Sequence, residues 1–297
     1  MDRPLAALAL IAGYAVLIGF TDNFVQVIAA ELGLWQFHAM RTAMALLVLA
    51  AVAGPLRLRL RPVRWRAVAA RSAIHATAMV IYFGALAFLP VAVVAAGLFT
   101  APIFVLLIGG LIYRQAITAV QVAAVATGFA GVVLVLGPEA MAGAAVLPVL
   151  AGALYAVGNV ATRAWCGQES AAVLAAGFFA ALGLFGLAGM AVLSALPVPL
   201  SVAEGAAGFL TRGVVWPGPA IWGWTLVQAV GSLLAVGLMV RGYQVTTAAR
   251  ASIFEYLVLP AAALWGWLLW GQMLAPRALL GLVLIALAGA IIIGRRR

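Results

Sequence analysis

The sequence predicts an all-α membrane protein: ten transmembrane helices, arranged as two inverted five-helix repeats, with both termini cytoplasmic. Of the 297 residues, 67% are hydrophobic and 8% are charged, and the mean hydropathy is +1.20. This composition is too apolar for a water-soluble surface. Apolar runs long enough to cross a hydrocarbon core of about 30 Å recur along the chain. No run alternates with period two, which excludes a transmembrane β-barrel.

The expected helices follow each other with mostly short connections. They cover residues 5–28, 34–53, 68–89, 91–112, 118–137, 145–164, 171–196, 219–240, 248–270 and 277–294. The first segment could instead be a signal peptide. However, it continues past Asp22 to about Ala29 without a convincing small-residue cleavage site, so we retain it as a helix.

The arginines set the expected topology, because cytoplasmic loops collect positive charge. All seventeen basic residues are arginines, and a cytoplasmic amino terminus leaves only Arg41, Arg212 and Arg277 outside. The run RLRLRPVRWRAVAAR at 57–71 could also be a nucleic-acid patch. Anchoring at the anionic inner leaflet explains it without a further assumption. We therefore expect a lipid-bilayer partner, no nucleic acid, and a multi-pass protein of the bacterial inner (plasma) membrane.

Missing residue types exclude several functions. Without lysine, the chain cannot form a retinal or pyridoxal Schiff base or supply a P-loop lysine. His38 and His75 lack the HExxH pattern of zinc proteases, and the single Cys166 excludes an internal disulfide and a cysteine metal cluster. Ser232 with His75 could form an intramembrane protease pair, but the GxSG-like context is absent. No enzyme activity, cofactor or metal is expected.

An internal repeat divides the chain into two halves. Residues 84–121 parallel residues 242–278: each stretch begins at a glycine, and their mid-helix prolines are Pro102 and Pro260. We expect one five-helix repeat at 1–140 and a second at 141–297, joined near GPEAMAGA. An odd number of spans inverts the second copy, as in secondary transporters, where one site can open to either side. Because one chain already holds both halves, a monomer is expected.

The sequence resembles the EamA type of the drug/metabolite transporter superfamily, and within it the YddG-like aromatic amino acid exporters. The matching residues are GFTDNF at the end of the first span, Arg41 in the second, and LAFLPVAVVAAGLFTAPIFVLLIGGLIYRQAIT with its weaker second copy. The resemblance covers essentially the whole chain and implies ten helices, cytoplasmic termini and efflux of small metabolites. The family often has glutamate where this chain has Gln115 and Gln272, so no proton-coupling role is carried over to that turn.

Polar side chains form single stripes on the first, third, sixth, eighth and ninth spans. Because polar groups facing lipid are costly, these spans, with the fourth, should surround a cavity, and the fifth and tenth should lie outside it. The expected substrate-binding residues are His75, Met79, Tyr82, Phe99, Tyr155, Asn159, Gln228, Glu255 and Tyr256. The alternative is that the polar groups only bond between helices, at under ~1 kcal/mol each, and that the aromatic residues only pack.

Glu255 is an acid deep in an apolar span, where a charge costs roughly 2.5 kcal/mol or more. We expect it to face the cavity, attract the ammonium group of an amino acid or another amine, and exchange it for a proton, because shielding from water eases protonation. The alternative is a structural ion pair with Arg241, Arg163 or Arg41.

Two further pairs are candidates for moving parts. Asp22 and Arg41, near the outer ends of adjacent spans, form either an outer gate or a static ion pair. Pro102 and Pro260 interrupt their helices at matching points and act either as hinges or as static kinks.

The expected function is export of small amphipathic metabolites by alternating access. Aromatic or other hydrophobic amino acids come first, because aromatic side chains beside one buried acid suit an ammonium group next to an apolar body. Efflux of cationic drugs uses the same chemistry. The competing class is a non-transporting membrane enzyme or scaffold.

Overall fold

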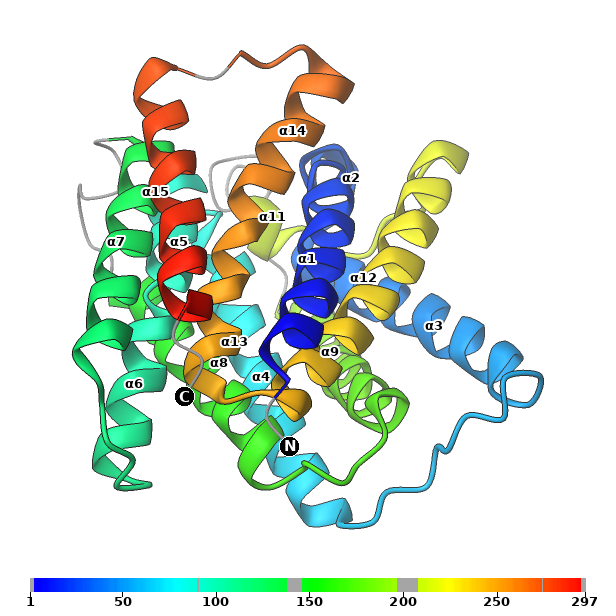
Figure 1. The fold of residues 1–297 in the computed structure, drawn as a ribbon. Coiled ribbons are helices and arrows are strands. Elements are labelled where there is room, and N and C mark those ends of the chain that lie inside the picture. Colours follow the sequence, from blue (N-terminus) through cyan, green and yellow to red (C-terminus); the bar gives the residue numbers. More distant parts are fainter. Residues whose placement is uncertain (1–2, 90, 138–145, 197–207, 274, 295–297) are drawn as a thin grey trace.

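The computed structural model describes residues 3–89, 91–137, 146–196, 208–273 and 275–294, and all regular elements within these ranges are helical (Figure 1). The α-helices are α1 Pro4–Asp22, α2 Val25–Glu31, α3 Leu34–Ala53, α4 Trp65–Ala85, α5 Val91–Leu98, α6 Ala101–Leu111, α7 Ala119–Leu136, α8 Val146–Ala164, α9 Ala171–Ala195, α11 Gly208–Thr211, α12 Pro219–Val245, α13 Ala248–Phe254, α14 Val258–Trp270 and α15 Pro276–Gly294. A 3₁₀ turn, η2 Glu255–Leu257, joins α13 to α14.

Each expected span coincides with helical structure. Among the described residues, nine helical stretches are long and apolar enough to cross a membrane, and Pro276–Ile292 in α15 is a shorter apolar helix. The largest difference between an expected and an observed helix end is at α12, which continues to Val245 instead of ending at residue 240. The expected junction between the halves lies outside the described residues, except for Gly137.

Three expected spans are interrupted. The first is divided into α1 and α2 at Asn23 and Phe24. The fourth is divided into α5 and α6, and Pro102 lies in the first turn of α6, where its missing amide hydrogen costs no helical bond. The ninth changes to 3₁₀ geometry at η2, just before Pro260. The two prolines therefore follow breaks in the helical ladder at corresponding places.

Side-chain caps begin other helices where the sequence offers them. Thr118 and Gln121 form a reciprocal capping box at the start of α7, with Gln121 N donating to Thr118 Oγ1 at 3.3 Å and Thr118 N donating to Gln121 Oε1 at 2.9 Å. Ser170 Oγ accepts from Val173 N at 3.1 Å at the start of α9. These bonds satisfy amide groups that the first helical turn leaves free.

The helices pack in a regular set of pairs. Helices α7 and α15 pack together at one edge (Figure 1), and α3 packs against α9. Helix α1 packs against α12 and α14, and α8 packs against α4 and against both α5 and α6. Glycines bring α7 and α15 close: a Cβ on Gly131 would lie 2.7 Å from the carbonyl oxygen of Gly281. The fifth and tenth expected spans, α7 and α15, therefore lie together at one edge of the bundle (Figure 1).

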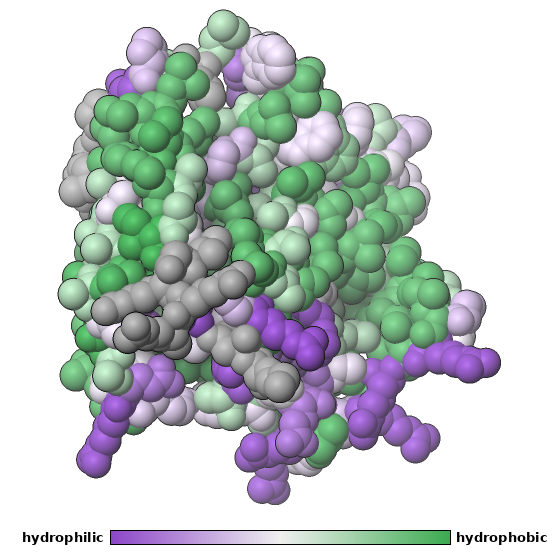
Figure 2. All heavy atoms as spheres, in the orientation of Figure 1, coloured by the Kyte–Doolittle hydropathy of each residue, from purple (hydrophilic) through white to green (hydrophobic). Residues whose placement is uncertain are grey.

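The surface has an apolar band and an arginine-rich end. Apolar side chains cover most of the face shown in Figure 2, and hydrophilic ones gather at its lower end. Leu184, Leu268 and Leu280 are each more than half exposed, which is unfavourable in water but suits a lipid environment. The arginine-rich segment 57–66 is fixed by Glu169, whose carboxylate accepts from the backbone amides of Val63 at 3.0 Å and Arg64 at 2.6 Å.

Candidate functional site

Buried polar side chains from α4, α8, α12 and η2 meet inside the bundle. His75 Nε2 donates to Oδ1 of Asn159 at 2.9 Å. The amide nitrogen of Asn159 donates to the Tyr243 hydroxyl at 2.9 Å and to Glu255 Oε1 at 3.4 Å. The hydroxyls of Tyr243 and Tyr155 also interact with the Glu255 carboxylate. We call His75, Tyr155, Asn159, Tyr243 and Glu255 the Glu255 cluster.

The backbone explains how Glu255 and His75 reach this cluster. Helix α13 ends at Phe254, and the tighter 3₁₀ turn changes the direction of the Glu255 side chain. Pro260 cannot donate to the Tyr256 carbonyl, which weakens the helical ladder at this turn. On α8, Gly158 leaves room for the imidazole, since a Cβ there would lie 2.5 Å from His75 Nδ1.

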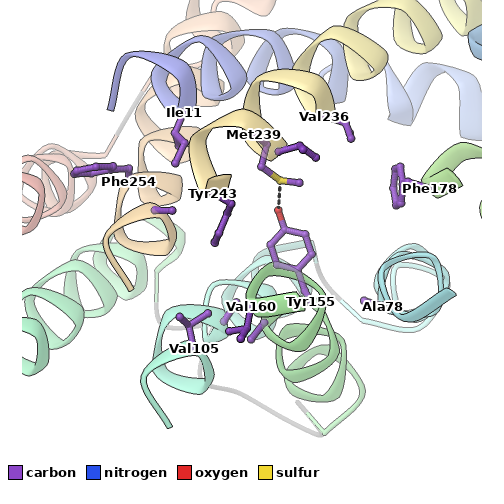
Figure 3. Packing of buried hydrophobic residues seen from close by; sticks show 14 of the residues in the cluster. Ile11, Ala78, Val105, Tyr155, Val160, Phe178, Val236, Met239, Tyr243 and Phe254 are labelled. Carbon is purple, nitrogen blue, oxygen red and sulfur yellow. Dashed lines mark hydrogen bonds between the residues drawn. The ribbon is translucent and has the colours of Figure 1, made fainter. Parts of the chain in front are cut away.

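Tyr155 extends the cluster toward α1 and α12. Its hydroxyl donates to Met239 Sδ at 3.0 Å, and Figure 3 shows the two side chains pointing toward each other, with Tyr243 on the same side as Met239. The Tyr14 hydroxyl of α1 lies 3.5 Å from that of Tyr155. The His75 ring stands edge-to-face against Tyr155, with centroids 5.2 Å apart. A carboxylate, three phenols and a thioether thus share one mostly apolar environment.

A second group of polar side chains joins α1, α3 and α12, and in it His38, Arg41 and Gln228 are buried whereas Asp22 is exposed. Gln228 lies between an acid and a base: its Oε1 accepts from Arg41 Nη1 at 3.2 Å, and its Nε2 donates to Asp22 Oδ1 at 3.5 Å. Arg41 Nη2 donates to His38 Nδ1 at 3.2 Å. We call Asp22, His38, Arg41 and Gln228 the Arg41 cluster. The expected Asp22–Arg41 pair is thus bridged by Gln228.

Met79 and Tyr82 continue along α4 from His75. Met79 contacts apolar residues of both the main core and the smaller core formed by α2, α3, α4 and α12. The Tyr82 ring stands edge-to-face against Phe83, with centroids 5.2 Å apart. Phe83 in turn lies next to His38, at 5.4 Å between ring centroids. This face of α4 therefore connects the two polar clusters.

Phe99 and Tyr256 lie on another side of the broken helices. Their ring centroids are 6.1 Å apart. Tyr256 is fully buried and packs directly against Gly128 of α7, where a Cβ would collide with its ring. The structure therefore places Tyr256 toward α7 and not beside Glu255, although the two residues are neighbours in the chain.

The arginines suggested as ion-pair partners of Glu255 bond elsewhere. Arg163 donates to the Gln244 carbonyl at 2.6 Å, and Arg241 donates to the Gln244 side chain at 3.0 Å. Arg41 belongs to the other cluster. Glu255 is 7% exposed, and its neighbours named above are neutral hydrogen-bonding groups. The arrangement is therefore suited to receiving a cation, because a buried carboxylate is stabilised by a charged partner.

The structure corrects one expectation for the arginines and adds residues that the sequence reasoning missed. Arg71, expected at the cytoplasmic surface, is fully buried and donates to Thr162 Oγ1 at 2.9 Å and to the Leu174 carbonyl at 3.2 Å. Tyr243 was missed because it follows the expected end of its span. His38 was not assigned to the site, although its three-residue spacing from Arg41 already placed both on one helix face.

A cleft of about 210 Å³ opens between α6, α8 and α13. Arg163, Gln115 and Thr247 contribute polar groups to its lining, and Val160 of α8, next to Asn159, forms part of its wall. The cleft therefore extends from the connection after α6, which carries Gln115, toward the helix that positions Asn159. Among the described residues, no three His, Cys, Asp or Glu side chains are grouped to hold a metal ion.

Comparisons with known proteins found similarity to transporters. Residues 5–137 match the profile of the EamA-like transporter family. A riboflavin transporter from Brucella anthropi is 25% identical over 201 residues, covering 67% of this chain and 66% of that protein, just under two thirds of its length. One solved structure, described as the crystal structure of a protein, has the same fold. Its TM-score to this chain is 0.76, the two sequences are 18% identical, and the match covers 98% of each chain. With the apolar helices, the family match indicates a multi-pass membrane protein.

Proposed function

We propose that this protein is an EamA-like secondary transporter that exports small amphipathic metabolites, first of all aromatic or hydrophobic amino acids, across the bacterial inner membrane. The observation that carries the proposal is the buried Glu255 carboxylate, held by Asn159 at 3.4 Å inside a multi-pass helical bundle. A membrane protein retains a deep acid at a cost, and such residues mark substrate or ion paths. The family profile over residues 5–137 supports transport.

The helix pairs support two inverted repeats, 1–140 and 141–297, and the arginine distribution supports cytoplasmic termini. Under this proposal α1 corresponds to α8, α4 to α12, and α5 with α6 to α13 with α14. The contact of α1 with α12 then corresponds to that of α8 with α4, and the contact of α1 with α14 to that of α8 with α5 and α6. Such a two-fold relation allows one central site to alternate between the two sides, and a monomer is sufficient.

The Glu255 cluster would bind the polar end of the substrate. The carboxylate attracts an ammonium group, and the hydroxyls of Tyr155 and Tyr243 accept its remaining hydrogens. Met239 and Phe178, which lies 6.2 Å from the His75 ring, offer apolar contacts to the substrate body. A proton on Glu255 could replace the ammonium group on the return step, because both neutralise the same buried charge.

The moving parts would be the broken helices and the Arg41 cluster. Pro102 and Pro260 follow matching interruptions, and such breaks are common sites of bending. Asp22 and Arg41 are joined through Gln228 by bonds of 3.5 and 3.2 Å, and a change in the α1–α12 packing would break the bond between Asp22 and Gln228. We propose this connection as the outer gate.

Riboflavin is a second candidate substrate because the Brucella anthropi relative is named a riboflavin transporter. Its flat, largely uncharged ring system would use the aromatic residues more than Glu255. Cationic compounds are a third candidate, since the ammonium site would accept them. A non-transporting enzyme or scaffold is the alternative of another class and predicts no solute flux.

Counterflow in liposomes that contain the purified protein tests these functions together. Vesicles are loaded with unlabelled phenylalanine, methyl viologen or riboflavin, and uptake of the same labelled solute is followed against empty liposomes. We expect phenylalanine counterflow. Counterflow of only methyl viologen or only riboflavin would assign the corresponding alternative. No counterflow of any solute tested would contradict the proposed function.

A further inference from the structure

Arg41 is a buried cation whose donors are only partly used. It lies two turns inside α3 and is 4% exposed. Nη1 bonds to Gln228 and Nη2 to His38, each at 3.2 Å, whereas Nε has no partner among the described residues. An unused donor on a buried charge costs more than one on a neutral group. Arg41 therefore offers a bond to an acceptor that enters the bundle.

His38 offers a second donor on the same face of α3. A guanidinium can only donate, so His38 Nδ1 must accept from Arg41 and the neutral ring carries its hydrogen on Nε2. That nitrogen is buried and has no partner in the described part of the chain. His38 and Arg41 are three residues apart, so their side chains share one helix face. Two unsatisfied donors thus come from one short stretch of α3.

The surroundings favour a ligand with a carboxylate and an apolar body. The Arg41 guanidinium carbon lies 4.8, 5.6 and 5.7 Å from the ring centres of Phe37, Phe179 and Phe83. Asp22 is the nearby acid, and it is held through Gln228. Arginine pairs with carboxylates more strongly than with neutral acceptors. The free donors therefore match an anion that would enter beside aromatic rings.

We propose that Arg41 and His38 bind the carboxylate group of the transported solute. The inference rests on the proposed transport function and narrows its substrate class to amphipathic carboxylates, with zwitterionic amino acids as the members that also carry an ammonium group for Glu255. Tyr14 lies on α1, which also carries Asp22, and its hydroxyl is 3.5 Å from that of Tyr155 in the Glu255 cluster, so α1 connects the two clusters. A cation without a carboxylate satisfies only Glu255, and riboflavin satisfies neither charge.

Competition on the wild-type protein tests the assignment without any substitution. Unlabelled phenylalanine and phenylalaninamide, which keeps the ammonium group but lacks the carboxylate, compete with labelled phenylalanine in counterflow. We expect the amide to inhibit at least about tenfold more weakly, as loss of one charged hydrogen bond predicts. Equal inhibition by the two compounds would overturn the inference while transport itself stands. Absence of phenylalanine counterflow would instead count against the proposed function.

A substitution then assigns the effect to Arg41. In Arg41→Gln we expect phenylalanine counterflow to fall at least about tenfold and the preference for phenylalanine over its amide to disappear. Arg241→Gln is the control, because Arg241 is exposed and, within the described part of the chain, bonds to the Gln244 side chain alone. If Arg41 only paired with Asp22, neither Arg41→Gln nor Asp22→Asn would change the preference for phenylalanine over its amide. That result would make the inference wrong. A preference retained in Arg41→Gln overturns it as well.

Discussion

The two broken helices use the same backbone device for different purposes. In the first, Gly97 comes just before the break between α5 and α6, and a Cβ there would collide with Pro148 of α8. In the second, the residue at the same offset from the proline is Glu255, in η2. The first break is closed by backbone packing, whereas the second presents a carboxylate to Asn159.

The difference shows how two helices that are broken in a similar way can present different groups to the bundle interior. Each break interrupts the regular backbone hydrogen bonds of the helix just before a proline, so one residue can point into the bundle. Glycine at that position permits close helix packing, and glutamate supplies a charge. We therefore expect changes at the second break to affect transport and changes at the first to affect stability.

The largest effect is expected from Glu255→Gln. The substitution keeps the volume and removes the charge, so counterflow of phenylalanine should fall about tenfold to a hundredfold, the worth of one charged hydrogen bond. The dependence of the remaining flux on external pH should also change. Glu31→Gln, at an exposed acid that accepts from Gly218 N at 3.1 Å, is the control. Undiminished flux with an unchanged pH response would remove Glu255 from the proposed mechanism.

Gly97→Ala should mainly destabilise the protein. The added methyl group would force α5 away from Pro148 and cost about 2 kcal/mol. Thermal unfolding in detergent should show a midpoint lower by about 4 to 8 °C. Gly223→Ala is the matched control, because nothing lies within 4 Å of a Cβ there, and alanine favours the helix. Equal midpoints for the two variants would contradict the close α5–α8 packing.

Gly158→Ala should disturb the site more gently. The methyl group would press on His75 Nδ1, from 2.5 Å, and shift the ring away from Asn159. Loss of this hydrogen bond, worth about 1 kcal/mol, should lower counterflow about fivefold. Gly237→Ala, with open space around the added Cβ, should transport like the wild type. If both variants transported equally, His75 would have no part in holding Asn159.

The sequence predicts the helices of the fold better than it predicts which side chains meet in the candidate site. Long apolar runs determine helices on their own, so α3 was predicted from residue 34 to 53 and observed there. The breaks depend on packing as well: Pro102 and Pro260 marked two of them, but nothing local marked Asn23 as a third. The residues that meet at Glu255 come from four elements, and which stripes face each other is decided only by packing.

Particular residues show which parts of the candidate site the sequence could and could not predict. Asn159 and His75 were expected together and do bond. Tyr256 follows Glu255 in the chain, yet a 3₁₀ turn directs it to α7. Arg71 was expected at the inner leaflet because it ends the arginine-rich run 57–71, whereas Thr162 and Leu174 supply its acceptors inside the bundle. Such partners, far along the chain, have no local sequence signal.

The smallest effect is expected at the first proline. Pro102 lies in the first turn of α6, where no helical hydrogen bond is lost. Pro102→Ala should therefore change the free energy of unfolding by less than about 0.5 kcal/mol. Pro260→Ala would restore a donor opposite the Tyr256 carbonyl and should slow counterflow if the second break bends during transport. Equal counterflow rates for both variants would favour static kinks over hinges.

The most direct test asks whether the space between the two clusters is on the solute path. Met79→Cys, combined with Cys166→Ser, places one thiol on the α4 face that connects the clusters. We predict that a water-soluble thiol reagent labels it and that phenylalanine slows the labelling. Met273→Cys, in the same Cys166→Ser background, is the control: its side chain follows the end of α14 and is 84% exposed, so phenylalanine should not slow its labelling. A thiol at position 79 that stays unlabelled, or is labelled equally fast with phenylalanine present, would contradict the account.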